Sequence, residues 1–258
     1  MPAAKPTPST AARFQCDDPA APARYFALVP CAGSGSRAGT AQPKQYQLIA
    51  GRPLVMHTLW ALAGVARLEG GLVVLTPGDD FAWPEGGQWP DLFMRQACGG
   101  ATRAHSVFQG LQALAALGVR DIDWVLVHDA ARCLVTPQMV DALIDACAGD
   151  PVGGLLALPL PDTLKQEADG RSHTTVFRAD KWLAQTPQMF RLGALRDALA
   201  ERVAGDFAGI TDEASAMEMA AHAPLLVAGS AHNFKVTYPQ DFALAQAILQ
   251  TRKTESSQ

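Results

Sequence analysis

Short apolar runs alternate with stretches of helical spacing along most of this chain. Each of four runs has four consecutive apolar residues next to turn residues, a pattern typical of buried strands: 26–29, 72–75, 124–127 and 155–158. Three stretches between them repeat apolar residues at helical spacing: 54–62, 107–115 and 137–147. Strands that alternate with helices predict an α/β fold with a doubly wound, mainly parallel sheet. Ligands of such sheets bind at the carboxyl ends of the strands.

The alternation breaks at about residues 160–180. Asp169-Gly170 is a strong two-residue hairpin signal between two polar segments, so residues 163–177 are predicted to form a β-hairpin. A polar hairpin of this length has little core of its own. It either projects and is covered by a second subunit or folds as an edge hairpin on its own domain. The spacing leaves both arrangements open.

The last third of the chain returns to strands and helices. Its predicted elements are a helix at 192–203, a helix that opens within 210–215, a strand at 225–227 and a helix from Pro239. Thr211 is a candidate cap of the second of these helices, and Asp212 and Glu213 favour its positive end. Lys235 lies between Phe234 and Val236, and we assign it to an apolar strand.

We expect a single domain over residues 25–252, because neither a repeat nor a linker interrupts the pattern. Residues 1–24 are rich in Ala, Pro, Ser and Thr and are predicted to be a flexible extension without a signal peptide. Residues 253–258 are predicted to be a polar tail. No apolar run approaches the roughly 18 residues that span a membrane, so we expect a soluble, cytoplasmic protein.

Composition and charge exclude several classes of protein. Apolar residues make up 48% of the chain and charged residues 18%, which is enough for a full core. A net charge of -4 argues against a nucleic-acid surface, which normally carries a clustered basic excess. The five cysteines include no C-x-x-C pair, so we expect reduced thiols in a cytosolic protein. The histidines show neither H-x-x-x-H nor H-E-x-x-H spacing, which argues against zinc.

The richest candidate chemistry follows the first strand. Pro30 ends the apolar run, and residues 31–36 are all small, so their backbone N–H groups can approach an anion closely. Arg37 and Lys44 follow within one loop's length. A strand, a small-residue turn and two cations predict a site for the phosphates of a nucleotide.

Two other interpretations of this loop are open. Gly33-x-Gly35-x-x-Ala38 also fits the dinucleotide-binding fingerprint, but residues 50–60 lack the acidic residue that would bind the ribose. Pro43 also disfavours a helix directly after the glycines. The second interpretation is an ordinary glycine-rich turn between a strand and a helix.

Two charged residues further along are candidates for the same crevice. Asp129 directly follows an apolar strand and is placed to bind a ribose or a divalent cation such as Mg²⁺, although pairing with Arg132 explains it equally well. Lys235 either neutralises phosphate charge or points outward from an edge strand. An attacking phosphate is already anionic, so transfer onto a nucleotide's α-phosphorus needs cations and alignment but no general base. Arg37, Lys44 and Lys235 are the candidate catalytic cations.

The motifs that carry this chemistry run in one order over about residues 26–250: Pro30–Arg37, Pro43–Tyr46, Gly99-Gly100 with Arg103 and Ser106, His128–Arg132, Asp162-Thr163, Gln185–Gln188, Ile210–Ser215 and Lys235–Thr237. This set resembles the 2-C-methyl-D-erythritol 4-phosphate cytidylyltransferase family. The resemblance implies transfer of a cytidylyl group from CTP to methylerythritol phosphate, giving 4-diphosphocytidyl-2-C-methyl-D-erythritol and pyrophosphate in the non-mevalonate isoprenoid pathway. It also implies a Rossmann-like, glycosyltransferase-A-like nucleotidyltransferase fold, Mg²⁺ as cofactor, and a homodimer joined through projecting hairpin arms.

The resemblance also assigns residues of this chain to the site. Arg37 and Lys44 would hold the triphosphate and stabilise the transition state, and Lys235 would assist them. The implied CTP-binding residues are Cys31, Ala32, Gly33, Gly35, Gly100, Ser106, Asp129 and Ala130. The implied acceptor-binding residues are Thr163, Arg178, Thr186 and Thr211. Either Asp129 or the CTP phosphates would hold the metal. Because Thr163 and Arg178 lie on or beside the arm, each site is expected to borrow from the partner subunit.

Three positions depart from the pattern of the family. Cys31 stands where members usually have Ala, Cys133 where they have Pro, and Ala101 where they have Asp. Ala101 removes a carboxylate beside the base pocket, which leaves the selectivity for cytosine open. Two alternatives to the implied reaction are a cytidylyltransferase for another polyol phosphate, such as ribitol 5-phosphate, and a non-catalytic nucleotide-binding protein. The presence of Arg37, Lys44 and Lys235 argues against the non-catalytic protein.

Overall fold

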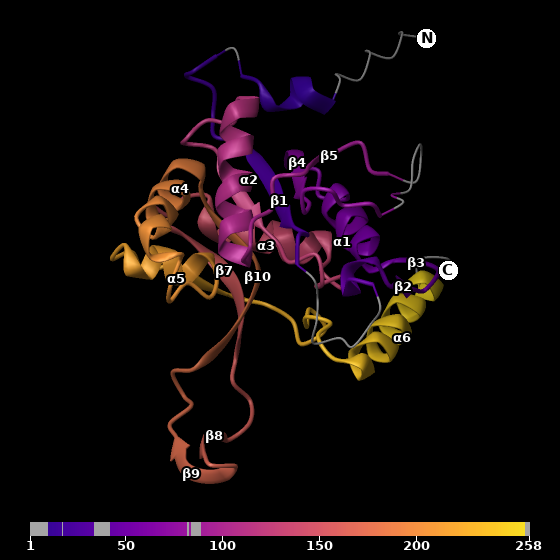
Figure 1. Cartoon of the computed structure of the whole chain (residues 1–258), viewed down its shortest axis with the longest axis vertical. Helices are drawn as coiled ribbons and strands as arrows, with labels where there is room; N and C mark the ends of the chain where they lie inside the picture. Colours follow the sequence, from indigo (N-terminus) through magenta and orange to yellow (C-terminus); the bar gives the residue numbers. More distant parts are fainter. Residues whose placement is uncertain (1–9, 17, 34–41, 82, 84–88, 256–258) are drawn as a thin grey trace.

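A seven-stranded sheet with the order β11-β7-β10-β6-β1-β4-β5 forms the centre of the molecule (Figure 1). The computed structural model describes residues 10–16, 18–33, 42–81, 83 and 89–255. The strands are β1 (Tyr25–Pro30), β4 (Leu68–Val74), β5 (Phe93–Gln96), β6 (Trp124–Val127), β7 (Gly153–Pro159), β10 (Trp182–Arg191) and β11 (Leu225–Ala228). Strand β10 runs antiparallel to β6 and β7, and the other neighbours are parallel. The prediction of a doubly wound, mainly parallel sheet is confirmed.

Helices cover both faces of the sheet, because successive side chains of a strand point to opposite faces. Ala27 and Val29 of β1 join the core beneath α1 (Leu54–Ala63) and α3 (Pro137–Cys147). Phe26 and Leu28 join the opposite core. Three helices cover that second core: α2 (Arg103–Leu117), α4 (Leu192–Ala200) and α5 (Glu213–Met219). The first strand is therefore buried on both sides, as its unbroken apolar run predicts.

A third, smaller core lies under α6 (Pro239–Glu255). It includes Ile49 of the short β2 (Leu48–Ile49), which pairs with β3 (Arg52–Pro53). Val236 also belongs to it, and its N–H donates to the carbonyl oxygen of Ala131. The strand predicted around Lys235 is wrong, because this segment is irregular and attaches to the loop after β6 instead of to a neighbouring strand.

Local signals determine where several helices begin. Thr136 accepts a hydrogen bond from the N–H of Met139, and Pro137 occupies the first turn, so α3 matches its predicted bounds. The predicted cap of α5 is wrong. Asp212, and not Thr211, is the N-cap, and its carboxylate accepts from the N–H of Ser215 in a capping box. A carboxylate is favoured there because its charge also complements the positive end of the helix.

The described part of the N-terminal segment is packed, which corrects the prediction of a flexible extension over residues 1–24. The 3₁₀-helix η1 (Thr10–Phe14) places Phe14 in full burial, with its ring 5.5 Å from that of Phe26. The Arg24 guanidinium donates to the carbonyl oxygens of Phe14 and Gln15 and forms an ion pair with buried Asp123. The composition of the whole segment indicated flexibility, because the few residues that anchor it contribute little to that average. Residues 1–9 and 17 lie outside the described part.

The predicted hairpin is confirmed. Strands β8 (Leu164–Ala168) and β9 (Arg171–Val176) pair antiparallel, and Asp169 and Gly170 both have positive φ, as a tight hairpin turn requires. The hairpin extends well away from the sheet on the chain between β7 and β10 (Figure 1). We call residues 160–181 the arm.

Candidate active site

A cavity of about 300 Å³ opens at the carboxyl ends of β1 and β6. All described members of the implied CTP site line it: Cys31, Ala32, Gly33, Gly100, Ser106, Asp129 and Ala130. Lys44 and Lys235 line the same cavity. Gly35 and Arg37 lie outside the described residues. The described residues that the resemblance implies for the CTP site and for catalysis therefore come together at one cavity, although they belong to segments as distant in the chain as Cys31 and Lys235.

The residues after β1 are braced by η3 (Lys44–Tyr46). Gln45 Nε2 donates to the carbonyl oxygens of Cys31 (3.1 Å) and Gly33 (2.8 Å). Lys44 Nζ donates to the carbonyl oxygen of Val236 at 2.8 Å, so its ammonium lies next to the segment that carries Lys235. Burial of Cys31 raises the pKa of its thiol well above the usual range, which keeps the thiol protonated and unreactive. Cys31 therefore acts here as a small apolar residue.

The turn at Gly99-Gly100, of which Gly100 lines the cavity, packs too closely against its neighbours to carry side chains. A Cβ atom on Gly99 would lie 2.3 Å from the Cβ of Ala32, and one on Gly100 would lie 2.5 Å from the Cβ of His105. Ser106 braces this turn, since its Oγ accepts from the N–H of Gly100 (3.2 Å) and donates to the carbonyl oxygen of Thr102 (3.0 Å). Side chains at these two positions would collide with Ala32 and His105, so both positions require glycine.

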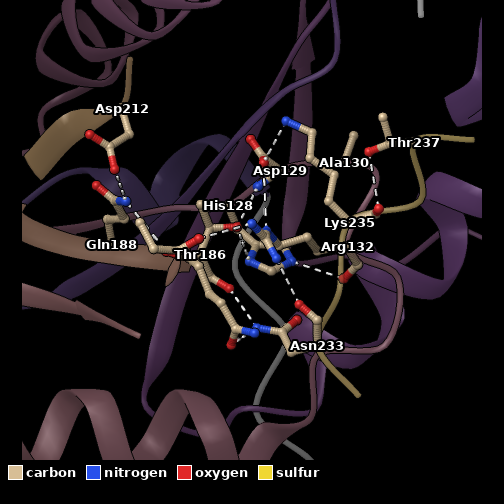
Figure 2. A network of polar contacts seen from close by, with 12 residues as sticks. His128, Asp129, Ala130, Arg132, Thr186, Gln188, Asp212, Asn233, Lys235 and Thr237 are labelled. Atoms are coloured by element: carbon tan, nitrogen blue, oxygen red, sulfur yellow. Dashed lines mark hydrogen bonds and ion pairs between the residues drawn. The ribbon is translucent and has the colours of Figure 1, made fainter. Parts of the chain in front are cut away.

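Asp129 is the centre of a charged network (Figure 2). Its Oδ1 accepts from Arg103 Nε at 2.8 Å, its Oδ2 pairs with Lys235 Nζ at 2.9 Å, and Arg132 Nε lies 3.7 Å from Oδ2. Burial opposes ionisation of Asp129, but the charges of Arg103, Lys235 and Arg132 outweigh it and hold its pKa well below the usual range. Asp129 is therefore a permanent anion that orients Lys235.

Arg103 joins Asp129 to a second buried carboxylate. Its Nη1 and Nη2 donate to Oε1 and Oε2 of Glu213 at 2.7 and 3.0 Å. The sequence analysis gave Glu213 only a local role, at the positive end of α5. Glu213 lies 110 residues from Arg103 and occupies the first helical position of that helix. A negative charge next to a helix N-terminus is favourable in itself, so no local signal pointed to a distant partner.

The loop between β6 and Arg132 is held by His128 and Thr186. His128 Nε2 lies 3.1 Å from the carbonyl oxygen of Arg132, which can only accept, so Nε2 carries the proton and Nδ1 accepts from the Thr186 hydroxyl at 3.1 Å. The same hydroxyl oxygen accepts from the N–H of Asp129 at 3.0 Å. Burial lowers the pKa of His128 to about 4, so the ring is neutral near pH 7.

The four implied acceptor residues do not meet within one subunit. Thr186 is buried beside Asp129. Thr163 and Arg178 line a hollow at the base of the arm, and Thr211 lines a different hollow at the β7–β11 edge of the sheet. Neither hollow shares a lining residue with the main cavity.

The described residues offer little to a divalent cation. Within them, no group of three or more His, Cys, Asp or Glu side chains could hold a metal ion. Asp129 is the one carboxylate that lines the main cavity in the described part of the chain, and both of its oxygens already contact cations. A preformed metal centre on protein side chains does not fit this site.

Comparison with known proteins identifies the family. The model of the 2-C-methyl-D-erythritol 4-phosphate cytidylyltransferase family matches residues 25–251. The chain belongs to this family. It is therefore a CTP-dependent cytidylyltransferase that acts on methylerythritol phosphate, as the motifs predicted. In the described residues no helix has both the length and the apolar character needed to cross a membrane.

Two similar proteins agree with this family. A 2-C-methyl-D-erythritol 4-phosphate cytidylyltransferase of Paraburkholderia phytofirmans is 52% identical over 88% of this chain and 96% of its own length. A bifunctional IspD/IspF enzyme of Albidiferax ferrireducens is 60% identical over 91% of this chain, which spans only 55% of that relative.

Solved structures of the cytidylyltransferase family share the fold. A crystal structure of 4-diphosphocytidyl-2C-methyl-D-erythritol synthase has a TM-score of 0.75 and 35% identity, covering 89% of this chain and all of its own. The enzyme of Francisella tularensis has a TM-score of 0.74 and 30% identity, covering 86% of this chain and 98% of its own. The fold prediction is thus confirmed at the level of the family as well as of the sheet.

Proposed function

We propose that the main cavity binds CTP, with the base against the Gly99-Gly100 wall and the triphosphate between Lys44 and Lys235. The observation that carries this proposal is the convergence of the two lysines on a cavity whose other lining residues are mostly small, with Gln45, Arg103 and Asp129 as the larger ones. Arg37, which lies outside the described residues, would supply a third cation to the triphosphate. A polyanion gains most from such cations in a partly buried site, where charges are screened less than in water.

In this proposal the reaction needs no general base. A phosphate oxygen of methylerythritol phosphate forms a bond to the α-phosphorus of CTP, and the bond to the bridging oxygen of the β-phosphate breaks. That oxygen leaves with the electron pair as part of pyrophosphate. Lys44 and Lys235 would neutralise the charge that builds up on the phosphate oxygens. Asp129, ionised throughout, would hold Lys235 in place and contact the ribose side of CTP.

We further propose that Mg²⁺ enters this site with the phosphates of CTP and is held by them, because both oxygens of Asp129 are engaged. When bound, the ion would neutralise phosphate charge. A cytoplasmic location is part of the same proposal, since all five cysteines are free thiols.

The acceptor half of the proposed site is shared between two subunits. The arm leaves Thr163 and Arg178 away from the cavity of their own chain and exposes Phe177 (74% exposed) and Leu183 (48%) near its base. Exposed apolar residues of this size favour contact with a second subunit. We expect a homodimer in which each arm delivers Thr163 and Arg178 to the acceptor phosphate beside the partner's cavity.

Pyrophosphate release from purified protein with Mg²⁺ tests the substrates. CTP is supplied with methylerythritol phosphate or ribitol 5-phosphate, and ATP, GTP and UTP serve as nucleotide controls. Release only with CTP and methylerythritol phosphate is expected, even though Ala101 lacks a carboxylate. Release with ribitol 5-phosphate instead would overturn the acceptor assignment, and equal release with UTP would overturn the assignment of the base.

A further inference from the structure

The buried pair Arg103–Glu213 connects the two halves of the proposed site. Arg103 is the first residue of α2, next to the Gly99-Gly100 wall on the nucleotide side. Glu213 is the first residue of α5, two positions after Thr211 on the proposed acceptor side. The Glu213 side chain is only 2% exposed and both of its oxygens accept from Arg103. Burial of this carboxylate is favourable only while the guanidinium stays in place.

The geometry of Arg103 couples Glu213 to Asp129. A guanidinium is planar, and here its two Nη atoms face Glu213 while its Nε faces Asp129 at 2.8 Å. A rotation that keeps one carboxylate in contact moves the donor away from the other. The orientation of Asp129, and through it that of Lys235 at 2.9 Å, is therefore set partly by the position of α5.

The start of α5 is fixed from a second direction as well. Gln188 of β10 donates through Nε2 to Asp212 Oδ2 at 2.8 Å, and its Oε1 accepts from the N–H of Ala214 at 2.7 Å. These contacts hold the first turn of α5 against the sheet, whereas the Arg103–Glu213 pair holds it against α2. Arg103 contacts Asp129 directly, whereas Gln188 reaches Asp129 only through Gln185, Asn233 and Thr186.

We propose that Glu213 is a positioning residue for the transfer reaction. It acts through Arg103 to keep Asp129 oriented and to hold the turn at 211–213, on the proposed acceptor side, at a fixed position relative to the CTP cavity. The inference rests on the proposed function. Without the Glu213 charge, Arg103 is free to turn toward the phosphates, and the acceptor side loses its fixed distance from the α-phosphorus. Glu213 itself does not line the CTP cavity, so the walls of that cavity stay in place.

Glu213→Gln removes the charge with little change of shape, and Glu201→Gln, an exposed glutamate after α4, is the matched control. We expect Glu213→Gln to raise the KM for methylerythritol phosphate about tenfold, as the loss of a charged hydrogen bond predicts, and to raise the KM for CTP by a smaller factor, because Asp129 and Lys235 lose part of their orientation. A merely structural role would lower the melting temperature and the active fraction but leave both KM values unchanged, and that result would overturn the proposal.

A double-variant cycle tests whether the effect passes through Arg103. We expect Arg103→Gln/Glu213→Gln to lose no more kcat/KM than Arg103→Gln alone, whereas losses that multiply would show that Glu213 acts independently. If Glu213→Gln does not fold, Arg103→Lys serves instead, because it keeps the charge but cannot form the fork. Unchanged KM values in Arg103→Lys would overturn the proposal. If the wild-type enzyme uses a different acceptor phosphate, the KM comparison is made with that acceptor, so the two proposals fail separately.

Discussion

At the scale of single residues, some side chains line the cavity, and others hold the lining residues in place. Lys44 and Lys235 line the cavity, whereas the hydroxyl of Thr186 is committed to His128 and to the backbone of Asp129. Thr186 was assigned to the acceptor from the family motif, and its proton is not available to a ligand while His128 is neutral. Within one subunit it acts first as a brace for Asp129.

The histidine brace predicts a pH dependence of stability. The pKa of His128 is about 4 in the folded protein, against about 6.5 in the unfolded chain, so the unfolded chain binds more protons between these values. Stability is fully present above pH 6.5 and falls as the pH drops toward 4. Urea unfolding at pH 7.5 and 5.0 should show that the advantage of wild type over His128→Gln shrinks by about 2 kcal/mol at the lower pH. An advantage that is equal at both pH values would contradict the buried neutral ring.

The lysine of η3 predicts a specific loss of turnover. Lys44→Gln keeps a donor for the Val236 carbonyl but removes the positive charge, so we expect kcat to fall about a hundredfold or more with the fold intact. Circular dichroism checks the fold and pyrophosphate release checks kcat. Lys253→Ala, on α6 away from the cavity, is the control and should retain full activity. Near-normal turnover of Lys44→Gln would remove Lys44 from the proposed mechanism.

At the scale of elements, sequence reasoning succeeded where local chemistry decides. Thr136-Pro137 predicts the start of α3, Asp169-Gly170 predicts the hairpin turn, and the unbroken run 124–127 predicts β6, and all three are confirmed. It missed β10, because an antiparallel strand inserted into a parallel sheet has no helix before it to mark its place. It also placed Lys235 on a strand. The apolar–polar alternation of residues 234–236 is too short to distinguish a strand from an irregular segment whose backbone bonds to another loop.

Contacts between distant segments were the other limit. Arg103 and Glu213 are 110 residues apart, and no local pattern marks them as partners. The packing of η1 likewise depends on Asp123, 99 residues from Arg24. Composition near the N-terminus resembles that of a flexible segment, yet one phenylalanine and one arginine attach it to the sheet.

This N-terminal attachment predicts a change in stability without a change in chemistry. Phe14 is fully buried and touches Gly70 so closely that a Cβ there would lie 3.1 Å from its ring. We expect Phe14→Ala to reduce the free energy of unfolding by about 3–5 kcal/mol, because it leaves a cavity against β4. Urea unfolding measures this loss, and kcat/KM of the folded fraction should not change. The exposed Val203→Ala should shift stability by less than about 0.5 kcal/mol, and a similar small shift for Phe14→Ala would show that the segment is not anchored.

At the scale of the whole molecule, the arm contributes little to the packing of its own subunit. Strands β8 and β9 pair only with each other, and nearly all of their residues are exposed, so they add little to the core. Arg178 donates to the carbonyl oxygens of Leu160 and Pro161 at the base of the arm, which fixes the guanidinium on the arm itself and not at the cavity. Under the proposed function, the arm serves the reaction by reaching the cavity of a second copy of the chain.

Mixing two inactive variants tests this arrangement directly. Lys44→Ala damages the cavity and Arg178→Ala damages the arm, and each homodimer is expected to be inactive. If the arm serves the partner's site, a mixed dimer has one intact site, formed by the cavity of the Arg178→Ala subunit and the arm of the Lys44→Ala subunit. An equal mixture, refolded or coexpressed, should then recover about a quarter of wild-type activity, because half of the dimers are mixed and half of their sites are intact. If each arm served its own cavity, every site in the mixture would carry one lesion and no activity would return. Light scattering on both variants establishes that they still dimerise, so an absence of recovery would reject the shared site and not merely the dimer.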